Sequence, residues 1–199
     1  MALDRLAAQR LIRRSGQETF LSAGQELVPS QRLLDFWRWS GSDLLVNTMR
    51  GLVAEYLVAL ALGVADNPRV EWEPYDLLSP TGVKVEVKST ARFQSWVQAY
   101  PSPLEFGIAK TQPRDSTNKP VGERRRHADI YVFCVLDHID EALDPLNLDH
   151  WKFYVLPTST LNARLCDQKQ MRLSTLRTLE PSIVPFEELK ETIHLRAGS

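Results

Sequence analysis

The stretch that most constrains the fold is residues 82–90, which read GVKVEVKST. Valines alternate there with charged residues, and successive side chains of a β-strand point to opposite faces. The valines therefore share one face, which suits packing on a hydrophobic core. Glu86 and Lys88 share the other face two residues apart, and this spacing indicates either an ion pair or a reactive site.

The residues before this strand predict how it is paired. SPTG at 79–82 supplies a turn between the short apolar segment YDLL and the alternating strand. A three-residue loop, with a type I turn followed by a glycine in the left-handed region, places Asp76 opposite Glu86. Opposed residues of an antiparallel pair share a face, with Cβ atoms about 5 Å apart. A two-residue turn would instead shift Asp76 by one position.

Two facing carboxylates repel each other unless a cation offsets their charge. Asp76, Glu86 and Lys88 are therefore expected to cluster around a divalent cation, and hard oxygen ligands suit Mg²⁺.

The clearest helix is predicted from Ser42, a suitable cap, to Gly63, a suitable terminator. One stripe of this helix carries Asn47, Gly51 and Glu55 at four-residue spacing. A glycine inside a helix costs about 1 kcal/mol relative to alanine. It indicates either a close approach of another group to the backbone or a chance glycine on a solvated face.

The remaining pattern predicts one α/β domain with a mixed central β-sheet flanked by helices. A helical extension is expected at 1–40, the core at 42–160 and a C-terminal helical or loop segment at 161–199. Further strands are expected at 69–72, 128–136 and 151–158, further helices at 3–11, from Ser30 and at 185–193, and a weaker helix at 92–100. Trp37 and Trp39 are expected to be buried, with stacking on nucleic-acid bases as the alternative.

Composition excludes several classes of protein. The 199 residues carry a formal net charge of −1, so overall charge does not indicate a nucleic-acid binder. Cys134 and Cys166 form no C-x-x-C pair, which predicts a reduced, cytoplasmic compartment without a disulfide framework. The beginning of the sequence lacks a secretory signal, and no apolar stretch is long enough to span a bilayer, so no membrane partner is expected. The four histidines show no metal-ligand spacing.

The pattern YDLL, turn, VKVEVKS resembles the PD-(D/E)XK nuclease superfamily, which has the restriction-endonuclease-like fold. The signature of that superfamily is an acidic residue on one strand followed by Glu-x-Lys on the next, here Asp76 and then Glu86 to Lys88. Glu55 in RGLVAEYLV matches the glutamate that many members carry on the preceding helix. PYD stands where the usual pattern has PD. The longer run from EVKSTARFQSW to DHWKFYVLPT also resembles uncharacterised bacterial proteins of this group.

This resemblance implies a metal-dependent endonuclease that hydrolyses phosphodiester bonds of DNA, with restriction or genome defence as its role. It implies that Asp76, Glu86 and Glu55 hold Mg²⁺ together with the backbone carbonyl of Val87, and that Mn²⁺ can substitute. Lys88 would orient a water or stabilise charge in the transition state. An ion pair is the alternative for Lys88. For the whole chain, the alternative is a catalytically inactive nuclease-fold module that binds nucleic acid or a protein.

Polar and basic residues outside this set are candidates for contacting DNA, with RNA not excluded. They are Asn47, Arg50, Ser89, Gln94, Arg124, Arg125 and Arg126. Ser89 and Gln94 follow the lysine where related enzymes place residues that position phosphate or water. The three consecutive arginines form the densest basic cluster, for which a solvated loop is the alternative. Cleavage of both DNA strands would favour a two-fold homodimer.

Overall fold

A computed structural model describes residues 12–71, 73–115, 117, 119–138 and 143–198. The chain divides into two compact units. The N-terminal unit comprises Met1–Ser42 with Asp66–Arg69, and the main unit comprises Asp43–Ala65 with Val70–Ser199. The helix predicted at 3–11 lies outside the described residues.

The N-terminal unit contains a short hairpin and one helix. The hairpin joins β1 (Leu21–Ser22) to β2 (Gln25–Glu26), and helix α1 (Leu33–Gly41) follows. The helix begins three residues after the expected Ser30, where the backbone N–H of Arg32 donates to Asp35 Oδ2 at 2.8 Å. No residue of α1 is buried, and Trp39 is 84% exposed. Trp37 is 41% exposed, so the predicted burial of both tryptophans is wrong, because this small unit builds no core against the helix.

The principal helix of the main unit is α2 (Asn47–Leu62). It begins five residues after the predicted start at Ser42, because Asp43 Oδ1 accepts from the N–H of Leu45 at 3.2 Å and holds a turn there. Its end is the predicted one. Gly63 has a φ of 73°, the left-handed conformation that commonly terminates a helix.

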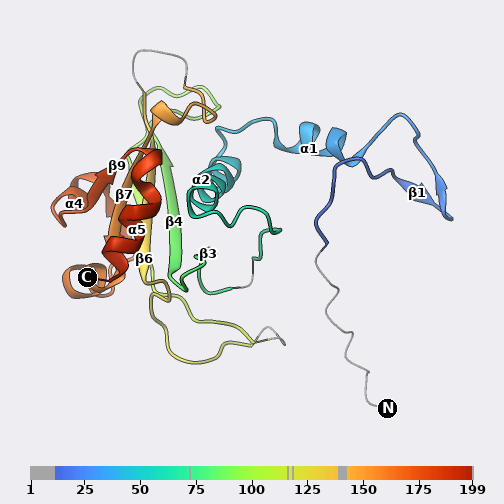
Figure 1. Ribbon diagram of the computed structural model, residues 1–199. Coiled ribbons are helices and arrows are strands. Elements are labelled where there is room, and N and C mark those ends of the chain that lie inside the picture. Colours follow the sequence, from blue (N-terminus) through green and yellow to red (C-terminus); the bar gives the residue numbers. More distant parts are fainter. Residues whose placement is uncertain (1–11, 72, 116, 118, 139–142, 199) are drawn as a thin grey trace. The chain divides into compact units, whose positions relative to one another are not determined.

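A mixed five-stranded sheet forms the centre of the main unit (Figure 1). Its order is β3 (Leu77–Leu78), β4 (Lys84–Ala91), β6 (Ile130–Leu136), β7 (Trp151–Pro157) and β9 (Ser182–Val184). Strands β4 and β6 are parallel, and the other neighbours are antiparallel. The predicted α/β class with a mixed sheet is therefore confirmed. The described residues of the stretch 69–72 form no strand.

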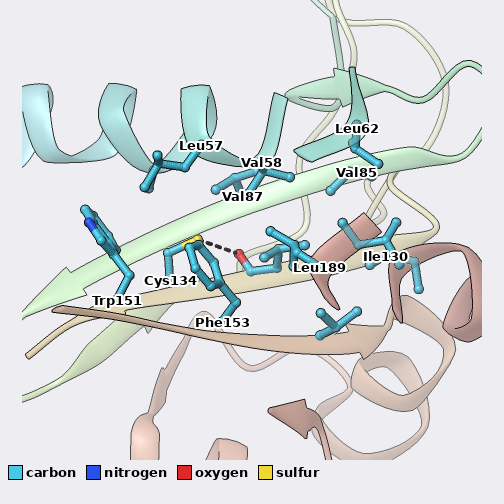
Figure 2. Packing of buried hydrophobic residues seen from close by; sticks show 14 of the residues in the cluster. Leu57, Val58, Leu62, Val85, Val87, Ile130, Cys134, Trp151, Phe153 and Leu189 are labelled. Atoms are coloured by element: carbon cyan, nitrogen blue, oxygen red, sulfur yellow. Dashed lines mark hydrogen bonds between the residues drawn. The ribbon is translucent and has the colours of Figure 1, made fainter. Parts of the chain in front are cut away.

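Helices α2 and α5 (Leu189–Ala197) pack on one face of this sheet. Figure 2 shows this core, in which Val85 and Val87 of β4 lie beneath Leu57 and Val58 of α2. The predicted valine face is confirmed.

A second core covers the opposite face of the sheet, where Tyr131 and Phe133 of β6 lie beside the alternating polar side of β4. Its outer layer consists of β5 (Glu105–Gly107), α3 (Thr158–Leu165), β8 (Gln170–Arg172) and α4 (Leu173–Arg177). Two short 3-10 turns complete the unit, at Leu148–His150 and Phe186–Glu188. None of the helices in the described residues has the length and apolar character needed to cross a bilayer.

The expected helix at 92–100 does not form. The segment is a loop in which the N–H of Gln94 donates to Gln98 Oε1 at 2.7 Å. Gln98 Nε2 in turn donates to Ser102 Oγ at 2.9 Å. These side-chain bonds hold a non-helical path, which corrects the predicted order of core elements.

Candidate active site

The turn between β3 and β4 has the predicted form. The N–H of Gly82 donates to the carbonyl of Ser79 at 3.0 Å, and Gly82 has a φ of 86°. Leu78 then pairs with Lys84. This is a three-residue loop with glycine in the left-handed position, and it gives the predicted register for Leu77 and Leu78. The opposition of Asp76 to Glu86 lies beyond the paired residues and stays a prediction.

Asp76 lies directly before β3 and points its carboxylate at β4. Its N–H donates to the carbonyl of Val85 at 3.1 Å, and its Oδ2 accepts from the N–H of Val87 at 2.7 Å. The pairing of β3 with β4 ends at Leu77 and Val85. Beyond this point the carboxylate of Asp76 takes the place of a strand partner at the outer edge of β4.

Glu86 and Lys88 form an ion pair on the polar face of β4. Lys88 Nζ lies 2.6 Å from Glu86 Oε1, and the two side chains are 30% and 18% exposed respectively. The ion pair that the sequence left as the alternative role of Lys88 is thus present in the structure.

The charges around this pair act on one another. Burial raises the pKa of Glu86, the charges of Asp76 and Glu55 raise it further, and Lys88 opposes both effects. Burial acts to lower the pKa of Lys88, but attraction to Glu86, Asp76 and Glu55 outweighs burial and raises it. Three carboxylates therefore interact electrostatically with one lysine, so the group carries an excess of negative charge.

Glu55 joins this cluster from α2, where it is only 8% exposed. A Cβ built on Gly51, one turn earlier, would meet no atom within 4 Å. The close approach to the backbone that Gly51 could indicate is therefore not observed, and its alternative as a chance glycine stands.

The donor atoms of this cluster fit Mg²⁺ in their chemistry. Asp76, Glu86 and Glu55 offer carboxylate oxygens, the ligands that Mg²⁺ prefers, and their excess negative charge is of the sign that a divalent cation offsets. Within the described residues, however, no three Asp, Glu, His or Cys side chains lie close enough to enclose a metal. Lys88 contacts Glu86, and Asp76 is bonded to the backbone of Val87. Metal binding would require these side chains to rearrange.

A hollow of about 380 Å³ opens beside the end of β4. It brings together the four predicted DNA contacts that flank the signature, although they come from two distant segments. Its lining residues are Asn47, Arg50, Ser89, Thr90, Ala91, Gln94, Trp96, Ser102, Pro103 and Glu105. Hereafter this is the Arg50 hollow.

The arginine cluster at 124–126 does not act as one surface. Arg124 is exposed and donates to the carbonyl of Lys110 at 3.1 Å, and Arg125 is exposed beside His127. Arg126 is 5% exposed, and its guanidinium donates to four protein acceptors. These are the carbonyls of Ile108, Cys166 and Gln168 and the side chain of Asn162. Burial indicates a structural role for Arg126 in place of the predicted contact with DNA.

Tyr131 and six of the residues that line the Arg50 hollow were not predicted, the six being Thr90, Ala91, Trp96, Ser102, Pro103 and Glu105. Tyr131 pairs with Glu86 across β4 and β6, and burial and the charge of Glu86 raise the pKa of its hydroxyl. Thr90 and Trp96 line the Arg50 hollow. Thr90 continues the alternation of Glu86 and Lys88, which was a usable signal, whereas Trp96 lay in a segment predicted to be helical.

One comparison with known proteins identifies a family for this chain. The model of the bacteriophage T4 endonuclease IV family matches residues 31–165. This segment is more than half of the chain and contains every predicted site residue. No curated protein matches the chain. The chain belongs to the bacteriophage T4 endonuclease IV family.

Proposed function

We propose that the protein is a Mg²⁺-dependent endonuclease of the PD-(D/E)XK type that hydrolyses phosphodiester bonds of DNA. The observation that carries this proposal is the charge cluster on β4, where Glu55, Asp76 and Glu86 all act on Lys88. A purely structural ion pair needs one carboxylate for one lysine. The surplus carboxylates, together with membership in an endonuclease family, support a metal-dependent nuclease.

Each residue of the cluster has a role in this proposal. Asp76 and Glu86 would hold Mg²⁺ with the backbone carbonyl of Val87, and Glu55 would contribute directly or through a water, with Mn²⁺ able to substitute. When bound, the ion would neutralise phosphate charge and lower the pKa of a bound water. The N–H and C=O of one residue in a strand point toward the same neighbour. The bond between the N–H of Val87 and Asp76 therefore supports the carbonyl of Val87 facing the same edge.

Lys88 supplies a positive charge from the protein itself, in addition to the charge of the metal ion. Its ammonium group reaches Glu86 Oε1 in the present arrangement. In the proposed reaction it would turn from Glu86 toward the phosphate or the attacking water, where it stabilises the charge that develops in the transition state. Binding of Mg²⁺ by Glu86 would favour this exchange, because the cation replaces Lys88 as the partner of the carboxylate.

The wider role follows the resemblance of the sequence. Restriction of foreign DNA or genome defence is the proposed role, in the cytoplasm, where the two free cysteines stay reduced. A two-fold homodimer would place two such sites on the two strands of a duplex.

The test combines metal binding with cleavage. Mg²⁺ and Mn²⁺ are titrated calorimetrically into wild type, Glu86→Gln and Glu187→Gln, and the same samples are incubated with supercoiled plasmid DNA and with RNA. Glu187 is an exposed glutamate outside the cluster and provides the matched control. We expect the metal-binding heat and DNA cleavage in wild type and in the control, and neither in Glu86→Gln.

The opposite results are equally informative. Cleavage retained by both Glu86→Gln and Lys88→Met, each folded, would contradict the proposal. Binding of DNA in EDTA without cleavage of any substrate by wild type would favour the inactive binding module. Cleavage confined to RNA would keep the chemistry and overturn the assignment of DNA as the substrate.

A further inference from the structure

Arg50 is a buried cation with neutral partners only. The residue is 5% exposed, and its terminal nitrogens donate to Asn47 Oδ1 at 2.6 Å, Gln94 Oε1 at 3.0 Å and the carbonyl of Leu45 at 3.1 Å. Its Nε is buried and has no hydrogen-bond partner. Within the described part of the chain, no carboxylate lies at ion-pair distance from Arg50. Burying an ion without a counter-charge is unfavourable, so such a guanidinium is a poor element to retain for packing alone.

The surroundings of Arg50 favour an anion. The polar residues that line the Arg50 hollow include Ser89, Thr90, Ser102 and Gln94. Its one acidic lining residue, Glu105, already pairs with Arg172 at 2.9 Å. Burial lowers the pKa of Arg50.

The start of α2 adds to this positive field. Asn47 is the first residue of the helix and lines the hollow, and the N-cap residue Val46 supplies no side-chain cap. The first turn of a helix carries unsatisfied N–H groups and a partial positive charge, both of which favour anions. The buried guanidinium and the uncapped helix start are two independent features that point to the same kind of ligand.

The position of the hollow identifies that ligand. Ser89 and Thr90 directly follow Lys88 on β4, so they lie about 3 and about 7 Å along the strand from Lys88, at about 3.3 Å per residue. A DNA strand carries one phosphate per about 3.4 Å of helix axis. The volume of about 380 Å³ suits a group larger than a single ion.

We propose that the Arg50 hollow is a phosphate subsite that binds a phosphodiester of the DNA strand one or two nucleotides from the bond that is cut. Arg50 donates to the phosphate oxygens, and Gln94 and Asn47 orient its guanidinium. The location relative to the cut bond rests on the proposed function, whereas the binding of phosphate does not.

The decisive variant is Gln94→Glu. It places a carboxylate where an amide oxygen now lies 3.0 Å from Arg50, so the protein supplies its own anion to the subsite. One bond, from Gln94 Nε2 to the carbonyl of Ala91, is lost, and an ion pair is gained. If Arg50 serves only the fold, this variant is tolerated or stabilised and its binding of DNA does not change.

The measurement is the affinity for a fluorescein-labelled DNA oligonucleotide of mixed sequence, single-stranded and duplex, by fluorescence anisotropy in EDTA over a range of NaCl concentrations. The proteins are wild type, Gln94→Glu, Arg50→Gln and Gln170→Glu. Gln170→Glu adds the same charge at an exposed residue of β8. We expect Gln94→Glu and Arg50→Gln to bind about tenfold more weakly, because one charge-assisted contact is lost. The slope of log K against log salt should fall in magnitude by about one. Gln170→Glu should resemble wild type.

Two outcomes would overturn the proposal. The first is a Gln94→Glu protein that melts like wild type and binds DNA with unchanged affinity and slope. The second is that inorganic phosphate at matched ionic strength competes with DNA for wild type, while the variants bind DNA with unchanged affinity. This result would indicate that the hollow binds free phosphate. Because the assay runs in EDTA, it measures DNA binding by the subsite even if the protein cleaves no DNA. Conversely, loss of cleavage in Glu86→Gln would still support the proposed function if the subsite proposal is wrong. If Arg50→Gln does not fold, the DNA affinity of Gln94→Glu relative to wild type still tests the proposal.

Discussion

Two arginines are buried to the same extent in this protein, and they are used in opposite ways. Arg50 and Arg126 are each 5% exposed, and neither has a carboxylate at ion-pair distance among the described residues. Arg126 uses all three of its side-chain nitrogens on four protein acceptors. Arg50 has three acceptors, an unpartnered Nε and a hollow beside it.

This difference separates a structural cation from one that is suited to a ligand. The acceptors of Arg126 belong to the segment before the basic cluster, to α3 and to the loop after α3, so its guanidinium ties three segments together. Arg50 ties the start of α2 to the loop after β4 with neutral bonds, and its buried Nε has no partner among the described residues. Removal of Arg126 should therefore damage the fold, and removal of Arg50 should mainly damage binding.

The largest effect is expected for Arg126→Met. Four acceptors lose their donor, and unsatisfied buried groups cost about 1–3 kcal/mol each, so the free energy of unfolding should fall by about 3 kcal/mol or more. Urea denaturation followed by circular dichroism measures this loss. Arg124→Met, at an exposed neighbour, should change stability by less than about 0.5 kcal/mol. A loss at Arg126 as small as that at Arg124 would break the comparison.

Asp76 allows its structural bond to be separated from its charge. Asp76→Ala leaves the N–H of Val87 without its partner and should cost about 1–3 kcal/mol of stability. Asp76→Asn keeps an oxygen acceptor and should cost less than half as much, yet abolish cleavage if the charge holds a metal. Urea denaturation and plasmid cleavage on the same samples separate the two effects. Equal stability losses in the two variants would show that the bond to Val87 does not matter.

Arg50→Met should act on substrate binding more than on stability. We expect KM for DNA cleavage to rise about tenfold, equivalent to about 1.4 kcal/mol, with kcat changed much less, because the subsite contacts ground state and transition state alike. Steady-state kinetics on an oligonucleotide substrate measures both constants. A stability loss as large as that of Arg126→Met, together with an unchanged KM, would make the two arginines equivalent.

The smallest effect on stability is expected at Glu86, whose charge is opposite in sign to that of the two arginines. Burial raises the pKa of Glu86 above its ordinary value of 4.5 in the folded protein, so the folded state binds this proton more tightly than the unfolded chain. The resulting stabilisation is present at acid pH and is lost as pH rises through the raised pKa. Glu86→Gln cannot ionise and should gain stability relative to wild type between about pH 4.5 and neutrality.

Melting temperatures in EDTA across this range measure the difference. Lys88 does not contribute to the change in this window, because the pKa of Lys88 is raised from 10.5 and its loss of charge falls at still higher pH. A difference between wild type and Glu86→Gln that does not depend on pH would show that burial of Glu86 carries no such cost.

The parts of the site that were predicted correctly are local in sequence. The turn at Gly82 and the alternation along β4 concern neighbouring residues, and the register follows from turn length alone. The predictions that were wrong concern segments whose conformation depends on hydrogen bonds to other residues. The loop at 92–100 has a sequence compatible with a helix, but bonds from Gln94 to Gln98 and from Gln98 to Ser102 hold another path.

Adjacency in sequence was also a poor guide to shared surroundings. Arg124, Arg125 and Arg126 were grouped because they are consecutive, yet one is buried and two are exposed. Arg50 and Gln94 are 44 residues apart and were named separately, yet they share one hydrogen bond and one hollow. An extended segment turns successive side chains in different directions, whereas tertiary packing joins residues without regard to their separation.

The sequence by itself determined the two-faced strand β4, its hairpin and the set of acidic and basic residues suited to phosphodiester chemistry, because side-chain alternation and turn geometry are local properties. Only the tertiary structure decided which charges are compensated. Burial and the position of acceptors from other segments gave Arg126 four acceptors, left the buried Nε of Arg50 without a partner among the described residues, and placed Glu86, Asp76 and Glu55 where their charges raise the pKa of Lys88. The free energy of a charge depends on all the groups that surround it, and those groups come together only when the chain folds.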